Sequence, residues 1–170
     1  ILEKSKSDTL VLMCRGSSPS SGEVREILQE NQIEANNYIY LRLPCAGRIP
    51  VEFIFKVLYA GIKRIVSIQC EDDFCRFKEG SKISKRRQLI SQKLLDYVGL
   101  GKDAFTVIEY ARKALYDSTK CVGCDKCIFI CPYGALEFES FATPKVNEEK
   151  CVGCGACQLV CPHHAIQVKG

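Results

Sequence analysis

The sequence has no tryptophan, a single methionine and two histidines among its 170 residues. No apolar run approaches the ~20 residues that a membrane-spanning helix needs, so we expect no membrane span. The start of the chain lacks the basic, apolar and small-residue regions of a secretory signal peptide. A G-x-G-x-x-G fingerprint and a phosphate-binding lysine pattern are also missing after the first apolar run. These absences argue against a membrane protein, a secreted protein and a nucleotide- or flavin-binding enzyme.

Cysteine is abundant, with 12 residues. Eight of them lie in two copies of C-x2-C-x2-C-x3-C-P, KCVGCDKCIFICP at 120–132 and KCVGCGACQLVCP at 150–162, offset by 30 residues. This spacing is typical of bacterial proteins that bind cubane iron–sulfur clusters. Three thiolates at i, i+3 and i+6 on a tightly wound loop reach three corners of one cube. The fourth cysteine points away from that cube, and in two-cluster ferredoxins it ligates the other cluster.

We therefore predict two [4Fe–4S] clusters with crossed ligands. The first set is Cys121, Cys124, Cys127 and Cys161, and the second is Cys151, Cys154, Cys157 and Cys131. We expect three glycines to let the backbone wrap closely and direct N–H groups at sulfur, namely Gly123, Gly153 and Gly155. Disulfides are disfavoured because nothing marks the chain as secreted. Zinc knuckles need C-x2-C pairs farther apart. Residues 115–168 resemble the two-cluster bacterial ferredoxins, which implies a small α+β domain.

The formal net charge is +4, which by itself invites a nucleic-acid hypothesis. A four-thiolate cluster carries a net charge of about −2 when oxidised, so three clusters would bring the loaded protein to roughly −2. We expect the basic residues to balance bound cofactor, and we expect no nucleic-acid partner.

Before the ferredoxin-like segment, short β-rich runs alternate with helical patterns. We predict strands at 9–13, 38–43, 64–69 and 105–109 and helices at 22–30, 50–60 and 81–98. The alternation predicts an α/β domain with an open parallel sheet and flanking helices, in a Rossmann- or flavodoxin-like order. In the last helix we expect Ser81 to be the N-cap and a buried stripe of Ile83, Ile90, Leu94 and Val98. Its basic residues are expected on the exposed side, either solvated or docked to an acidic partner: Lys82, Lys85, Arg86, Arg87 and Lys93.

The other four cysteines follow the predicted strands. Cys14, Cys45 and Cys70 each lie at the carboxyl end of a strand, and Cys75 lies in the loop after the third. Ligands of open α/β sheets bind at this edge, so we expect the four thiols to meet there and to bind metal. Helix N-termini at the same edge favour an anionic centre, and flanking residues would add backbone donors and positive charge, namely Arg15, Gly16, Gly47 and Arg48. The spacing leaves [2Fe–2S], [4Fe–4S] and zinc open.

Three stretches of the first domain form one pattern: LPCAGR at 43–48, QCEDDFC at 69–75 and KISKRRQLISQKLLDYVGL at 82–100. Residues 8–112 resemble the methyl-viologen-reducing hydrogenase delta-subunit family. The resemblance implies a [2Fe–2S] cluster held by Cys14, Cys45, Cys70 and Cys75. The chain has Ser17 where the family usually has a further cysteine, and Glu71 where a histidine is common. We expect the charges of Glu71, Asp72 and Asp73 to lower the potential of this centre or to turn to solvent.

The sequence thus predicts a [2Fe–2S] α/β domain at 1–114 and a two-[4Fe–4S] ferredoxin domain at 115–170. The family resemblance implies an electron-transfer subunit of a cytoplasmic, anaerobic hetero-oligomer, with no catalysis of its own. It would relay electrons between a hydrogenase or formate dehydrogenase and a heterodisulfide-reductase-like flavoprotein complex. The alternatives are a ferredoxin module joined to a zinc- or iron-stabilised interaction domain, and a small flavin-dependent reductase. The chain begins at Ile1 without a methionine, which is compatible with a trimmed subunit or the tail of a longer polypeptide.

Overall fold

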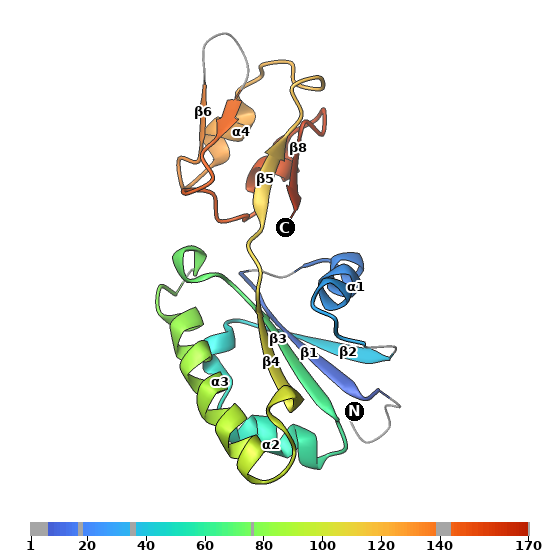
Figure 1. Ribbon diagram of the computed structural model, residues 1–170. Coiled ribbons are helices and arrows are strands. Elements are labelled where there is room, and N and C mark those ends of the chain that lie inside the picture. The colour runs from blue at the N-terminus through green and yellow to red at the C-terminus, as the bar shows by residue number, and fades with distance from the viewer. Residues whose placement is uncertain (1–6, 17–18, 35–36, 76, 139–143, 170) are drawn as a thin grey trace. The chain divides into compact units, whose positions relative to one another are not determined.

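A computed structural model describes residues 7–16, 19–34, 37–75, 77–138 and 144–169 of the chain (Figure 1). The chain divides into two compact units, Ile1–Tyr110 and Ala111–Gly170. This division lies close to the boundary predicted between residues 114 and 115. No helix in the described ranges is long and apolar enough to cross a membrane.

The first unit is built on a parallel sheet with the strand order β2-β1-β3-β4. Its strands are β1 (Thr9–Cys14), β2 (Tyr38–Leu43), β3 (Arg64–Gln69) and β4 (Phe105–Glu109). The helices are α1 (Ser21–Glu30), α2 (Val51–Tyr59) and α3 (Gly80–Tyr97), with short 3-10 turns η2 (Ala46–Arg48), η3 (Asp72–Phe74) and η4 (Lys102–Ala104). The predicted open α/β sheet is confirmed, in flavodoxin-like order.

Alternating side chains of β1 supply two cores, one on each face of the sheet. Val11 and Met13 pack with α1, while Leu10 and Leu12 pack on the opposite face, which α2 and α3 cover (Figure 1). All four of these side chains are almost fully buried. Because both faces are covered, the strands read as nearly continuous apolar runs, and the carboxyl edge of the sheet is held between two packed layers.

The face that α3 buries differs from the predicted one. Its buried residues are Gly80, Ser81, Ser84, Ser91 and Leu95. The predicted stripe is wrong because all its members are exposed, Ile83, Ile90, Leu94 and Val98. Small side chains face inward because the start of the helix lies against the η2 backbone, where a Cβ on Gly47 would collide with the Gly80 carbonyl. The predicted cap is also wrong: the helix begins at Gly80, and the N-cap Glu79 makes no side-chain cap bond.

Two basic residues of α3 also lie elsewhere than predicted. The Arg87 guanidinium donates to the carbonyls of Gly47 and Ile49, at 2.5 and 3.1 Å, and so fastens the helix to the η2 turn. Lys85 is half-buried and forms two ion pairs. The prediction that these two lie on the exposed side is therefore wrong, whereas the remaining three are exposed as predicted: Lys82, Arg86 and Lys93.

The neighbours Leu94 and Leu95 give a direct test of the buried face. Leu95 is fully buried and Leu94 is 43% exposed. We expect Leu95→Ala to lower the free energy of unfolding by about 2–5 kcal/mol, because it removes core contacts and leaves a cavity. Leu94→Ala, the same substitution one position earlier, should cost less than about 1 kcal/mol. Urea unfolding followed by circular dichroism measures both, and equal losses would contradict the placement of α3.

The second unit repeats one strand–loop–helix–strand pattern. The first copy contains β5 (Lys113–Tyr116), α4 (Lys126–Ile130) and β6 (Leu136–Phe138). The second contains β7 (Pro144–Val146), α5 (Ala156–Val160) and β8 (Ile166–Lys169). The antiparallel pairs β5–β8 and β6–β7 enclose a small core of Ala114, Leu136, Ile166 and Val168. This is the small α+β domain that the sequence predicts.

Candidate metal centres

Four cysteines of the first unit lie at the carboxyl edge of its sheet. Cys14 ends β1, Cys45 follows β2 by two positions, Cys70 follows β3 directly and Cys75 follows η3. The sulfurs of Cys14 and Cys70 are 3.6 Å apart. Cys14, Cys70 and Cys75 line one cavity, together with Arg15, Gly16, Pro44 and Phe77. The end of β1 and the loop after β3 thus bring these three thiols to one cavity.

Gly80, the first residue of α3, lies between the other pair of sulfurs. A Cβ placed on it would be 2.5 Å from the Sγ of Cys45 and 3.1 Å from the Sγ of Cys75. The first distance is shorter than real side chains show and the second is tight, so any larger residue at this position would crowd both sulfurs. The backbone at the start of α3 therefore approaches these two thiols closely.

Hydrogen bonds and burial act in opposite directions on these thiols. The hydrogen bond with Cys70 lowers the pKa of Cys14 to about 5, with further help from the backbone N–H groups of Gly16 and Ala46. Burial raises the pKa of Cys45, while the Gly47 N–H opposes that rise. The two glycines predicted as backbone donors thus act on the thiols that they flank. A thiolate is the form that ligates metal, and the backbone N–H groups beside Cys14 favour that form.

The donor set of this site is four thiols with backbone donors beside them. Within the described ranges, no three His, Cys, Asp or Glu side chains meet at a position for one metal ion. An iron–sulfur cluster spreads its thiolates over several irons and so takes sulfurs that stand farther apart. Four thiols, adjacent backbone donors and the space left by Gly80 fit such an anionic group.

The acidic residues of the Cys70–Cys75 loop differ in their exposure to solvent. Asp73 is exposed and turned to solvent, as one of the two expectations has it. Asp72 is half-buried, and its ion pair with Lys85 lowers the pKa of its carboxyl. Glu71 is half-buried as well. Ser17, where the family usually has a cysteine, lies outside the described residues.

The eight cysteines of the second unit line two cavities of four each. The first is lined by the thiols of Cys121, Cys124, Cys127 and Cys161. The second is lined by the thiols of Cys151, Cys154, Cys157 and Cys131. In each cavity three cysteines come from one copy of the motif and the fourth from the other. This is the grouping expected for crossed ligands.

The two motif loops have the same backbone geometry. Gly123 and Asp125 have positive φ in the first copy, and Gly153 and Gly155 in the second. At Gly153 a side chain would also collide with the Arg112 backbone. Backbone N–H groups reach four of the sulfurs at 3.3–3.4 Å, those of Cys121, Cys131, Cys151 and Cys161. Such donors stabilise negative charge on sulfur, which is what a bound cluster carries.

The repeat is broken at one position beside a cavity. Tyr116 and Val146 are equivalent in the two copies, and each lines its cavity. Burial beside the thiols raises the pKa of the Tyr116 phenol, and within the described residues its buried hydroxyl has no hydrogen-bond partner. The first cavity therefore contains a hydroxyl donor where the second has only the methyl groups of valine.

We expect Tyr116→Phe to lower the potential of one [4Fe–4S] centre and leave the other unchanged. A hydrogen bond from this unpartnered hydroxyl to a cluster sulfur would favour the reduced, more negative state, and its loss would be worth about 1 kcal/mol, which is about 40 mV for one electron. A redox titration monitored by electron paramagnetic resonance (EPR) measures the shift. Val146→Ala, the control at the equivalent position, removes no donor. Equal potentials before and after Tyr116→Phe would contradict the role given to the hydroxyl.

Sequence reasoning misses several residues around these centres. The local pattern marks Gly80 only as the residue before a helix, and Lys85 only as part of a basic surface. Their roles depend on how α3 lies on the sheet, which its own pattern does not reveal. Tyr116 could have been found by aligning the two motif copies, because tyrosine then stands against valine.

Comparison with known proteins agrees with both units. The family model described as "Methyl-viologen-reducing hydrogenase, delta subunit" matches residues 10–122, well over half of the chain. The model of a 4Fe-4S dicluster domain matches residues 114–168. This second match indicates two [4Fe–4S] clusters, and such centres transfer electrons.

A curated relative is an iron–sulfur subunit of the F420-non-reducing hydrogenase of Archaeoglobus profundus. It is 35% identical over 60 residues, which are 35% of this chain and 44% of the relative. The chain thus matches less than half of that protein's length. The family model is the broader finding, and by it the chain belongs to the methyl-viologen-reducing hydrogenase delta-subunit family.

Proposed function

We propose that the chain relays electrons between a hydrogenase- or formate-dehydrogenase-type donor and a heterodisulfide-reductase-like flavoprotein complex. In this proposal it works in the cytoplasm as a subunit or domain of a hetero-oligomer and catalyses no reaction alone. The relative from Archaeoglobus profundus, whose name is that of a hydrogenase iron–sulfur subunit, supports a hydrogenase-type donor.

One observation carries the proposal: the 12 cysteines of the chain gather into three groups of four. Two groups would hold [4Fe–4S] clusters, and Cys14, Cys45, Cys70 and Cys75 would hold a [2Fe–2S] cluster. When bound, these clusters supply one-electron carriers. The chain's own residues ligate them, donate backbone N–H groups to sulfur and exclude water from part of each site.

Iron and acid-labile sulfide on anaerobically purified full-length chain test the proposal. We expect about 10 iron atoms per chain, with one [2Fe–2S] and two [4Fe–4S] EPR signals on reduction. About 8 iron atoms and one zinc would overturn the redox role of the first unit and make it a structural adaptor. A flavin spectrum in the purified chain would instead favour a reductase.

The proposed partners are tested separately by electron transfer. The loaded chain is reduced by a hydrogenase under hydrogen and then mixed with a heterodisulfide-reductase-type flavoprotein. Flavin bleaching that requires the chain supports the relay. Bleaching at the same rate without the chain, or its absence with a fully loaded chain, would overturn the choice of partners.

A further inference from the structure

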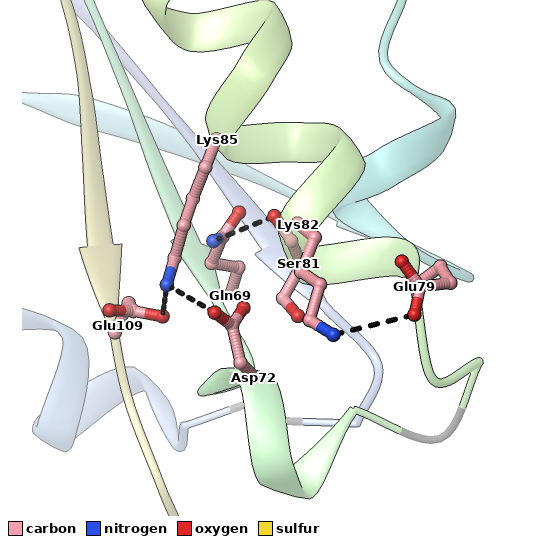
Figure 2. Close-up of polar contacts among 7 residues, drawn as sticks. All are labelled: Gln69, Asp72, Glu79, Ser81, Lys82, Lys85 and Glu109. Carbon is pink, nitrogen blue, oxygen red and sulfur yellow. Dashed lines mark hydrogen bonds and ion pairs between the residues drawn. The ribbon is translucent and has the colours of Figure 1, made fainter.

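A lysine from α3 forms an ion pair with Asp72, one of the three acidic residues of the Cys70–Cys75 loop. The Lys85 ammonium lies 2.9 Å from the Asp72 carboxylate and 2.7 Å from the Glu109 carboxylate. Figure 2 shows it between the two carboxylates. Asp72 belongs to η3 within the loop, and Glu109 is the last residue of β4. One side chain therefore joins a helix, the loop between two cysteines and the end of a strand.

A second contact fixes the same loop at its base. Gln69 directly precedes Cys70, and its side-chain amide donates to the Ser81 carbonyl in the first turn of α3 at 3.5 Å (Figure 2). Gln69 is almost fully buried and is paired in register with Glu109. The Tyr110 N–H donates to the Gln69 carbonyl at 2.9 Å. The start of the loop is therefore tied to α3 and to the residue after β4.

The charges of this network bear on whatever the thiols hold. The Lys85 ammonium lies within ion-pair distance of the carboxylates of both Asp72 and Glu109, so each carboxylate faces a positive charge. One lysine against two carboxylates leaves a single net negative charge on the group formed by Lys85, Asp72 and Glu109. Charge and orientation around the ligands of a centre tune its potential.

We propose that Lys85 is a positioning residue that holds the Cys70–Cys75 loop and sets the reduction potential of the centre bound there by neutralising Asp72. The proposal rests on the proposed function, because it requires a redox centre on Cys14, Cys45, Cys70 and Cys75. Reduction adds negative charge, so an unpaired carboxylate makes it less favourable. Lys85 keeps the potential higher than the acidic loop alone would allow.

The test compares variants of the full-length chain, purified anaerobically, that differ in the net charge of the group formed by Lys85, Asp72 and Glu109. Lys85→Met leaves two negative charges, and Asp72→Asn leaves none. The double variant leaves one, as in the wild-type chain. We expect Lys85→Met to make reduction about tenfold less favourable, a shift of ~59 mV to lower potential. Asp72→Asn should shift the potential upward, and the double variant should return close to the wild-type value.

EPR-monitored redox titration of the first-unit signal measures all three potentials. Lys93→Met is the matched control, since it removes the same charge from an exposed position on the same helix. Its shift should be much smaller. An unchanged potential in Lys85→Met, or a double variant as low as Lys85→Met, would overturn the proposal.

Iron analysis separates this proposal from the one that it rests on. A wild-type chain with only about 8 iron atoms would overturn both. A chain with about 10 iron atoms whose first-unit potential does not change on substitution of Lys85 or Asp72 would overturn only the role of Lys85. If Lys85→Met loses the first-unit centre, Asp72→Asn decides: an upward shift supports the proposal and no shift overturns it.

Discussion

Replacing Cys161 by serine is expected to remove the same centre as replacing Cys121, although the two belong to different copies of the motif. Both line the first cavity of the second unit. Each single variant should lose about 4 iron atoms, and the double variant Cys121→Ser/Cys161→Ser should lose no more than either. The losses are not additive because both thiols serve one cluster.

The matched control combines Cys121 with Cys131, which belongs to the same motif copy but lines the other cavity. Cys121→Ser/Cys131→Ser should lose about 8 iron atoms, one cluster for each substitution. Iron and sulfide analysis with EPR of the reduced chain measures each loss. The opposite pattern, with additive losses for Cys121 and Cys161, would show that each motif copy binds its own cluster.

A methyl group on Gly80 is expected to abolish the centre of the first unit. The added Cβ would be too close to the sulfurs of both Cys45 and Cys75. Gly80→Ala should therefore reduce the iron content from about 10 to about 8 and remove the [2Fe–2S] signal. Alanine is the better helix former, so helix propensity predicts the reverse, a gain in stability. A loss of iron would thus come from crowding at the thiols.

Gly22→Ala is the control for this substitution. Gly22 also lies in the first turn of a helix, and a Cβ there would meet nothing within 4 Å. Its iron content should stay at that of the wild-type chain, and its stability should rise by up to about 1 kcal/mol. Full iron content in Gly80→Ala would mean that the thiols stand farther from α3 when metal is bound.

Most of the fold follows from local signals in the sequence. The runs that end at Cys14 and Cys45 are short, apolar and bounded by turn residues, and β1 and β2 lie where these runs predict. The parallel arrangement of the sheet follows from the strand–helix alternation. The eight cysteines at 121–161 can be interpreted from the sequence, because the spacing in each motif copy brings three thiols to one loop.

What the sequence does not reveal depends on how α3 packs. Its apolar residues suggest one buried face, yet the helix turns Ser84 and Ser91 inward and leaves Ile90 exposed. Close approach to the η2 turn requires small side chains, and this tertiary requirement overrides the apolar pattern. The roles of Gly80 and Lys85 follow from that orientation, so neither can be assigned before α3 is placed.

Each cavity of the second unit draws its cysteines from both motif copies, and this has a consequence for cluster insertion during synthesis. Cys161 lines the first cavity and Cys131 the second, so neither half of the repeat supplies all four thiols of either cavity. During synthesis, the early motif must wait until the late one has left the ribosome. A cluster held in either cavity would therefore link the two halves, and a chain cut between β6 and β7 would divide the four thiols of each cavity between two fragments.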